Sequence, residues 1–501
     1  MSSRVTSAAF ATTLLAMYLT LGVPLLLLLP VERPLLWLAL ALLHECLALG
    51  IAIDFAELFF GWLLPRRIHP RLAEVDRSPV RVAVLYVCCD DIDVVSLASL
   101  RELRDVDVYI LDDSVTESSR RQVESSGIRV LRRADRADFK AGNLNHWLGR
   151  HGHGYDYFVV LDSDSVMTSD AVWDLVAHAE APENRDVAIV QSSILPRAGN
   201  CFQRYASIHV PVRNRILSRL HDAIGWTLSH GHNNLHRAAA IRAVGGFDTT
   251  ASCEDTTTSL RLLRDGWRII LVETASYDAE PRDIVAFRRR HVRWARQTIE
   301  VVGALKLQVG LAPALLMVRH VLAYLLPIAG TVSLALFLTG KTSRGPLPGL
   351  PSLAPETARL LGSVFVFALS GSLVAIALLR ILHCVLARQR LRALFLSSLL
   401  NSAAVAFCFA HTALGLLRSL LRRRVVFTPT GAARRLVPTF PQLLRSMPMT
   451  WIVWLAVAAM ATRQPFLEAG VLKVFWLICF AGSPLLLWFF HRDQTEEGGR
   501  S

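Results

Sequence analysis

The stretch FVVLDSDSVMTSDAV, residues 158–172, places two carboxylates directly after a run of apolar residues. Phe, Val, Val and Leu in succession predict a buried strand, at whose carboxyl end Asp162 and Asp164 would lie. Two interpretations are open at this point. The acids hold a ligand, or Asp162 or Ser163 caps a helix that begins near Asp170. The surrounding sequence has to decide between them.

Apolar segments of the same kind recur through the middle of the chain. They are RVAVLYV (residues 81–87), DVDVYILDD (105–113), GIRVLRR (127–133), YFVVLDSD (157–164) and VAIVQSS (187–193). Segments with helical patterns separate them, and strands that alternate with helices are typical of an α/β domain with a mostly parallel sheet. We therefore expect one such domain over residues 66–305, which is long enough to bury its own core.

The chain has 501 residues, of which 52% are hydrophobic, and a net charge of +13. This composition is too apolar for an ordinary soluble protein and too charged in its middle for a pure membrane bundle. Residues 8–30 carry no charge and are long enough to cross a bilayer as a helix, and residues 34–53 form a second apolar run. A signal peptide is the alternative for the first run, but a second span follows at once. We expect two transmembrane helices within residues 1–65.

The C-terminal region, residues 306–501, contains further apolar runs that could span a membrane. These are residues 321–340, 361–379, 447–462 and 471–490. The run at about 391–421 has arginine clusters at both ends, so we interpret it as an amphipathic helix along the cytoplasmic face. Because basic residues stay on the cytoplasmic side, six spans would leave both termini and the α/β domain there. The arginine clusters therefore predict a multi-pass protein of the inner (plasma) membrane. Nucleic-acid binding is not needed to explain them.

Polar motifs follow the predicted strands, and most of them contain acids or fixed cations. Two strands end in CCDD (residues 88–91) and LDDS (111–114), and later come DFKAGNLNHW (138–147), SHGHNN (229–234), SCEDTTTSLRLLRDGW (252–267) and RRRHVRWARQ (288–297). The carboxyl ends of the strands form the edge where open α/β sheets bind ligands. Acids beside cations favour a polyphosphate with a divalent metal, Mg²⁺ or Mn²⁺. No P-loop and no C-x-x-C pair is present, so neither a P-loop nucleotide site nor a cysteine zinc site is predicted.

The order of these motifs resembles the catalytic domain of membrane-bound family 2 processive glycosyltransferases. Cellulose synthase and the osmoregulated periplasmic glucan glucosyltransferase are members of that family. The segment RRRVVFTPTG (residues 422–431) is similar to the family's gating loop, which we place at about 422–435, after the interfacial helix. The resemblance implies a cytosolic domain of the GT-A type, inserted in an all-α transmembrane bundle of about six helices plus interfacial helices.

The resemblance also implies roles for the residues that would bind the sugar donor. Asp90 and Asp112 match acids that recognise the nucleotide of a nucleoside-diphosphate sugar. Lys140 matches the lysine that contacts its phosphates. Asp164 matches the metal ligand of the D-x-D motif, and Asp162 helps to fix the metal, the diphosphate and the sugar. On this basis the ligand interpretation of the D-x-D stretch replaces the helix cap.

The remaining implied roles concern catalysis and the acceptor. Asp255 in Cys-Glu-Asp matches the general base, next to Glu254. Arg293 matches the arginine that binds the diphosphate, and Trp294 the tryptophan that stacks on the acceptor sugar. His232 falls in the acceptor loop. With these residues an acceptor hydroxyl would displace the diphosphate with inversion.

Two departures from the family pattern point away from cellulose itself. Arg290 replaces the glutamine of Q-x-x-R-W, and residues 228–232 replace the acceptor motif F-F-C-G-S. Both are more similar to the periplasmic glucan enzyme. We expect transfer from UDP-glucose or a related UDP-sugar to a β-linked polysaccharide, exported across the membrane with a possible periplasmic partner. The alternatives are transfer of one sugar to a lipid phosphate and a non-catalytic nucleotide-sugar-binding membrane protein.

Overall fold

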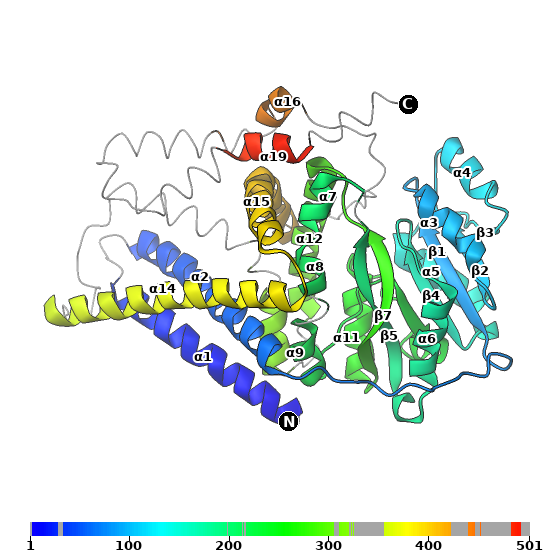
Figure 1. The fold of residues 1–501 in the computed structure, drawn as a ribbon, viewed down its shortest axis with the longest axis horizontal. Helices are drawn as coiled ribbons and strands as arrows, with labels where there is room; N and C mark the ends of the chain where they lie inside the picture. Colours follow the sequence, from blue (N-terminus) through cyan, green and yellow to red (C-terminus); the bar gives the residue numbers. More distant parts are fainter. Residues whose placement is uncertain are drawn as a thin grey trace. The chain divides into compact units, whose positions relative to one another are not determined.

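The computed structural model describes residues 3–28, 34–197, 199–212, 214, 217–304, 310–319, 322, 324, 355–421, 439–445, 451 and 482–491 (Figure 1). The chain forms two compact units. One consists of Leu64–Val309 with Arg422–Leu436, and the other of Met1–Leu63, Gly310–Leu421 and Val437–Ser501. The expected gating-like loop lies outside the described residues.

The unit that begins at Leu64 is built on a seven-stranded sheet with the order β3-β2-β1-β4-β6-β5-β7. Its strands are β1 (Val82–Cys88), β2 (Asp107–Asp112), β3 (Arg129–Leu131), β4 (Tyr157–Asp162), β5 (Val187–Arg197), β6 (Asn234–Arg237) and β7 (Arg268–Ala279). The pairings β1–β2, β1–β4, β2–β3 and β5–β7 are parallel, whereas β6 runs antiparallel to β4 and β5. The expected α/β domain with a mostly parallel sheet is therefore confirmed.

Helices connect the strands of this sheet. The α-helices are α3 (Val94–Ser99), α4 (Glu117–Glu124), α5 (Phe139–Arg150), α6 (Ser169–Glu180), α7 (Cys201–Ala206), α8 (His209–Val212), α9 (Ser218–Ala223), α10 (Ala238–Ala243), α11 (Glu254–Arg264) and α12 (Ile284–Ala304). Three short 3₁₀-helices are η1 (Leu100–Glu102), η2 (Gly152–Gly154) and η3 (Pro182–Asn184).

Both faces of the sheet are buried (Figure 1), which explains why its central strands are continuously apolar. Val84 and Tyr86 of β1 belong to one core, together with residues of α3, α4 and α6. Ala83 and Leu85 of the same strand belong to the other core, with residues of α5, α10 and α11. Residues that alternate along β1 thus serve opposite faces.

The sequence patterns indicated β1 to β5 but not β6 or β7. β6 has only four residues, and two of them, Asn234 and His236, are polar yet buried. β7 begins with an apolar run, but its second half, Glu273–Ala279, has a mixed burial pattern. β6 also accounts for the antiparallel pairings, because it is inserted between two parallel segments of the sheet.

The register of the parallel strands brings their acidic ends to one edge. Cys88 of β1 pairs with Asp112 of β2, and Val87 pairs with Asp162 of β4. α6 begins without help from the D-x-D acids, because the side chain of its N-cap, Thr168, accepts the hydrogen bond from the Ala171 N–H. The interpretation of Asp162 or Ser163 as the helix cap is therefore wrong.

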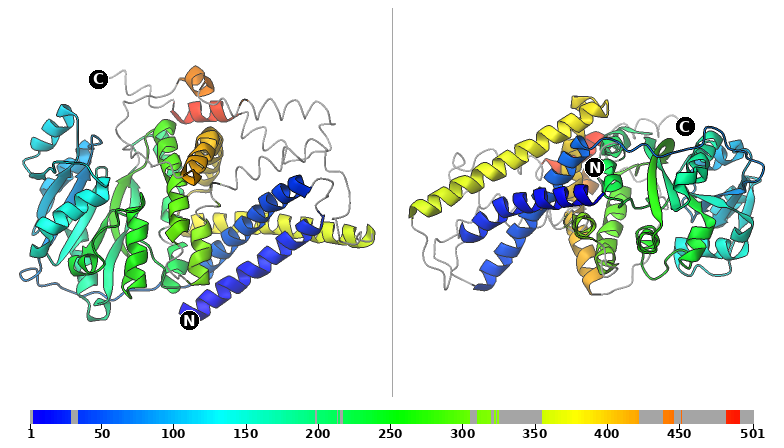
Figure 2. Two further views of the ribbon diagram at one scale, coloured as in Figure 1. Left: turned by 180° about the vertical axis from the view of Figure 1, so that it is seen from behind. Right: turned by 90° about the horizontal axis from the view of Figure 1, so that it is seen from below.

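The second unit is helical in the part that the structure describes. Its helices include α1 (Ser3–Leu28), α2 (Pro34–Leu63), α14 (Pro355–Leu386), α15 (Leu391–Leu420), α16 (Phe440–Arg445) and α19 (Ser483–His491). α1 packs against α2 and α14 (Figure 2). Asp54 of α2 accepts hydrogen bonds from Arg319 at 3.3 Å and from Arg380 of α14 at 3.1 Å.

Two helical segments in the described residues are long and apolar enough to cross a membrane, Ser3–Val23 and His44–Leu63. Val374–Leu386 of α14 and Leu391–Val405 of α15 are shorter apolar segments. The runs at 321–340, 447–462 and 471–490 fall largely outside the described residues, so the bundle of about six spans is not confirmed. α15 covers the expected interfacial helix, and its position along a membrane face stays a prediction.

Candidate active site

The D-x-D turn follows β4 in the chain and lies beside β7 in space. Asp162 is the last residue of β4, and the Ser165 N–H donates to its carbonyl oxygen at 3.0 Å. Val166 then forms an isolated antiparallel bridge with Tyr277 of β7, with N–H to carbonyl distances of 2.8 and 2.9 Å in the two directions. This bridge fixes the turn beside the end of β7, at Asp278.

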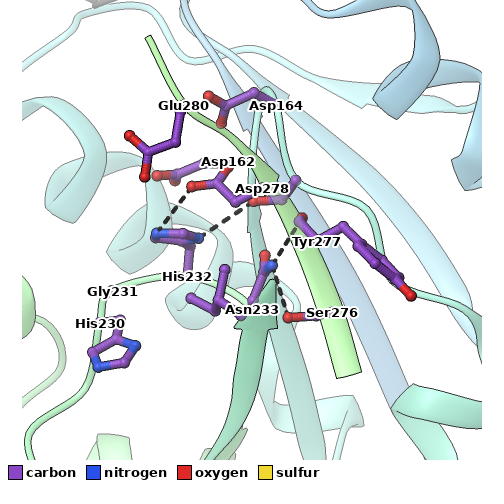
Figure 3. Close-up of polar contacts among 12 residues, drawn as sticks. Asp162, Asp164, His230, Gly231, His232, Asn233, Ser276, Tyr277, Asp278 and Glu280 are labelled. Atoms are coloured by element: carbon purple, nitrogen blue, oxygen red, sulfur yellow. Dashed lines mark hydrogen bonds and ion pairs between the residues drawn. The ribbon is translucent and has the colours of Figure 1, made fainter. Parts of the chain in front are cut away.

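Four acids gather at this place: Asp162, Asp164, Asp278 and Glu280 (Figure 3). Burial and then the charges of Asp278 and Asp162 raise the pKa of Asp164 well above its ordinary value. Burial, with the charges of Asp162 and Glu280, likewise raises the pKa of Asp278 to about 6. Sequence reasoning missed Asp278, although it follows the same rule of acids at strand ends.

Lys140 is the cation that contacts the Asp162 carboxylate of the D-x-D motif. Its Nζ donates to Oδ1 of Asp162 and, at 2.9 Å, to the carbonyl oxygen of Gly231. Burial would lower the pKa of Lys140, but the charges of Asp162 and Glu254 outweigh it and raise the pKa. Burial would raise the pKa of Asp162, and Lys140 reverses that effect, aided by His232 and Arg293. The two charges therefore hold each other ionised.

A tight turn positions Lys140. Asp138 and Phe139 have φ of +56° and +47°, which non-glycine residues seldom adopt. Arg133 donates to the Phe139 carbonyl oxygen at 2.7 Å and to both carboxylate oxygens of Asp113. A Cβ on Gly142 would lie 2.1 Å from the carbonyl oxygen of residue 137, so the turn requires glycine there. The lysine and glycine of the K-A-G motif thus serve one local structure.

Glu254 and Asp255 occupy the first turn of α11, where the helix dipole favours negative charge. The Thr256 N–H donates to Oδ1 of Asp255 at 2.7 Å. Gly231, with φ of +82°, lies against the side chain of Asp255. A small cavity opens beside them, lined by Leu144, Ile189, Ser229, Gly231, His236, Phe247, Glu254, Asp255 and Thr258. Lys140 therefore joins Asp162 to the loop that contacts Asp255.

Gly231→Ala tests this contact. A Cβ at position 231 would lie 3.0 Å from both Cβ and Oδ2 of Asp255, and positive φ costs alanine about 1 kcal/mol more than glycine. Because the methyl group displaces the carboxylate, we expect kcat for sugar transfer to fall roughly tenfold or more. Gly225→Ala is the matched control, with φ of +70° and nothing within 4 Å of the added Cβ. Equal kcat values in the two variants would refute the positioning role of Gly231.

Glu254 makes stability depend on pH. Burial, and then the adjacent Asp255, raise its pKa to about 7, against the effect of Lys140. The unfolded value is about 4.3, so ionisation of this carboxyl costs the folded state stability progressively as pH rises from about 4 through about 7. Glu254→Gln is therefore expected to raise Tm by a few degrees at about pH 8 and by much less at about pH 5. Thermal unfolding at several pH values checks this, and a pH-independent Tm difference would contradict it.

The acids after β1 and β2 have different surroundings. Asp90, with φ of +58°, accepts hydrogen bonds from the Thr116 hydroxyl at 2.6 Å and from the N–H groups of Val115 and Thr116. Asp112 is buried and accepts from Nε of Arg132 at 2.8 Å. The neighbouring Asp91, which sequence reasoning passed over, faces the D-x-D acids. Burial, with the charges of Asp164 and Asp162, raises its pKa to about 7.

The residues expected to bind diphosphate and acceptor lie on α12 and in the loop before β6. Burial lowers the pKa of Arg293, although Asp162 and Glu254 act in the opposite direction. Trp294 is 39% exposed, and the Arg290 guanidinium lies 4.9 Å from its ring centroid. His232 lies among the acids, with Nδ1 3.3 Å from the Ser165 hydroxyl and Nε2 3.9 Å from Asp278. Its expected acceptor-binding role stays a prediction.

The carboxylates at this edge could supply part of the ligand shell of a divalent cation. Within the described residues, no three His, Cys, Asp or Glu side chains are arranged to hold a metal ion by themselves. Asp164 and Asp278 do lie against each other, and Oδ1 of Asp278 is buried and receives no hydrogen bond from the described residues. Mg²⁺ is commonly held by one or two carboxylates, with substrate phosphate oxygens and water completing the shell. The donor set present fits that arrangement.

Comparison with known proteins gives the family. The profile described as Glycosyl transferase family group 2 matches residues 157–490. The chain belongs to this family and is a glycosyltransferase, as the order of its motifs predicted.

Curated relatives match only part of the chain. Cellulose synthase 1 catalytic subunit [UDP-forming] of Komagataeibacter xylinus is 28% identical over 278 residues, covering 50% of this chain and 37% of the relative. Glucans biosynthesis glucosyltransferase H of Rhodopseudomonas palustris (strain TIE-1) is 30% identical over 179 residues, covering 32% of this chain and 24% of the relative. The chain thus spans well under half the length of either relative.

Among solved structures, the mannosyltransferase PcManGT from Pyrobaculum calidifontis, in complex with GDP-Man and Mn²⁺, has a TM-score of 0.47 at 15% identity. That similarity covers 77% of this chain and 99% of the other.

Proposed function

We propose that the chain is an inverting, metal-dependent glycosyltransferase of the GT-A type that uses UDP-glucose or a related UDP-sugar to extend a β-linked polysaccharide. The observation that carries the proposal is the connection made by Lys140. Its ammonium contacts Asp162 of the D-x-D motif and the carbonyl of Gly231, and Gly231 lies against Asp255. A donor held by Asp162 would therefore lie next to Asp255, where a general base is needed.

The residues divide the reaction between them. Asp90 and Asp112 hold the nucleoside at the ends of β1 and β2, and Lys140 and Arg293 neutralise the diphosphate. Asp255 accepts the proton of the acceptor hydroxyl as that oxygen attacks the anomeric carbon. The bond to the diphosphate breaks on the opposite face, so an α-linked donor yields a β-glycoside.

Mg²⁺ or Mn²⁺ would be held by Asp164 and Asp162. When bound, the cation would supply positive charge to the leaving diphosphate. Glu254, whose pKa is raised to about 7, is only partly ionised at neutral pH and so adds less negative charge beside Asp255 than an ordinary glutamate would. Trp294 is exposed enough to stack on an acceptor sugar, with His232 completing the acceptor loop.

The proposal places the enzyme in the inner membrane as a multi-pass protein, with the catalytic domain in the cytoplasm and a glycan or lipid-linked acceptor. The two apolar helical segments, Ser3–Val23 and His44–Leu63, support membrane attachment. Export of the product, with a periplasmic partner, follows the resemblance to polysaccharide synthases.

Product analysis tests this function. The full chain, purified in lipid, is incubated with a UDP-sugar and Mn²⁺, and the product is examined by size and by NMR of its anomeric signals. A ladder of β-linked sugars is expected. Addition of one sugar to a lipid phosphate would replace polymer synthesis with lipid glycosylation, and α-linkages from an α-linked donor would refute inversion.

A further inference from the structure

We propose that Asp278, at the end of β7, is a further carboxylate of the donor site and shares the divalent cation with Asp164. The inference rests on the proposed metal-dependent function and adds a residue to it. No motif in the sequence assigned a role to Asp278. Its position follows from the fold of the described residues.

Backbone pairing brings the two carboxylates together from strands that are not neighbours. β4 and β7 are separated in the sheet by β6 and β5. The bridge between Val166 and Tyr277 nevertheless joins the two segments. Val166 follows the D-x-D turn, and Tyr277 directly precedes Asp278. The Asn233 amide also donates to the Tyr277 carbonyl oxygen, at 3.1 Å, and to the Ser276 hydroxyl, at 3.0 Å (Figure 3). The end of β7 is therefore held in place by four hydrogen bonds to two loops.

Asp164 and Asp278 differ from several neighbouring acids in their ion pairs. Several other acids here have a fixed cation: Asp162 has Lys140, Asp112 has Arg132, Asp113 has Arg133 and Asp93 has Arg197. In the part of the chain that the structure describes, no lysine or arginine forms an ion pair with Asp164 or Asp278. Arg290 pairs with Glu280, and the imidazole of His232 stays 3.9 Å from Asp278.

A buried oxygen also lacks a partner. Oδ1 of Asp278 is shielded from solvent, and no hydrogen-bond donor of the described residues reaches it. A buried carboxylate oxygen is costly to leave unmatched. A cation between Asp164 and Asp278 would satisfy this oxygen and remove the repulsion between the two carboxylates at once. Oxygen ligands of this kind suit Mg²⁺ or Mn²⁺.

The test measures Mn²⁺ binding directly. Free Mn²⁺ is followed by electron paramagnetic resonance while the ion is titrated into the full chain in lipid, with UDP present. Asp278→Asn and Asp164→Asn are each expected to weaken Mn²⁺ binding roughly tenfold or more. Asp186→Asn is the matched control, because Asp186 pairs with Arg268 at the opposite end of β7. It should bind Mn²⁺ as the wild type does.

Binding of UDP without metal, by calorimetry, shows whether the variant site is folded. Asp278→Asn is expected to bind metal-free UDP at least as tightly as the wild type, because one negative charge beside the diphosphate is gone. Wild-type Mn²⁺ affinity in a folded Asp278→Asn variant, with loss only in Asp164→Asn, would overturn this inference and leave the proposed function intact. Failure of the folded wild type to bind Mn²⁺ with UDP would overturn both.

Discussion

Asp255→Asn is expected to lower kcat for sugar transfer about 10²- to 10⁴-fold, the usual contribution of a general base, while the donor still binds. Asparagine has the shape of aspartate but cannot accept the proton from the acceptor hydroxyl. The side chain sits in the first turn of α11, against Gly231 and the cavity, and the Thr256 N–H holds one of its oxygens. The substitution therefore removes the base with little change in packing.

The comparison needs kcat and donor affinity measured separately. Asp265→Asn is the matched control, since Asp265 caps the other end of α11 and pairs with Arg264 on the surface. It should leave both quantities unchanged. If Asp255→Asn retained a large part of the wild-type kcat, the proton would have to go elsewhere, and Glu254 would be the next residue to test.

Lys140→Met should weaken donor binding tenfold or more and also lower stability by about 1–3 kcal/mol, because breaking a buried pair leaves its partner unpaired. We place the stability loss below the range for fully buried pairs because Asp162 is 37% exposed and water screens part of its charge. The lysine also stands near Glu254 and Asp255, whose charges contribute to its raised pKa. Its removal thus leaves three acids without their shared cation.

A double variant separates the two effects. Lys140→Met with Asp162→Asn removes both members of the pair, so it should recover much of the lost stability while donor binding stays weak. Arg150→Met serves as the control, because Arg150 is an exposed basic residue in the last turn of the same helix. Recovery of donor binding in the double variant would show that Lys140 acts only by balancing charge. Stability is read from thermal unfolding, and donor binding from calorimetry with UDP.

The sequence predicted the part of this site that depends on regular strands. Five apolar segments became β1 to β5, and the rule that strand ends meet at one edge brought Asp162, Asp164 and Lys140 together as expected. β7 was harder to recognise, because its second half carries Thr, Ser and Asp among the apolar residues. Asp278 was missed with it.

Some features of the site depend on local backbone conformation, which the hydrophobic periodicity of the sequence does not show. Asp90 and Asp91 are adjacent carboxylates, but Asp90 has a positive φ and accepts a hydrogen bond from Thr116, whereas Asp91 lies near the D-x-D acids. The bridge between Val166 and Tyr277 likewise joins residues far apart in the chain through a single pair of hydrogen bonds. Neither feature leaves a repeating pattern in the sequence.

The most direct test of the central claim is release of nucleoside diphosphate by the full chain purified in lipid. A panel of UDP- and GDP-sugars is supplied with Mn²⁺, Mg²⁺ or a chelator, and Asp255→Asn is assayed in parallel. We predict release from a UDP-sugar that requires the cation and disappears in the variant. Donor binding without release in every condition, including added glycan and lipid acceptors, would contradict catalysis at this site and would favour a nucleotide-sugar-binding protein.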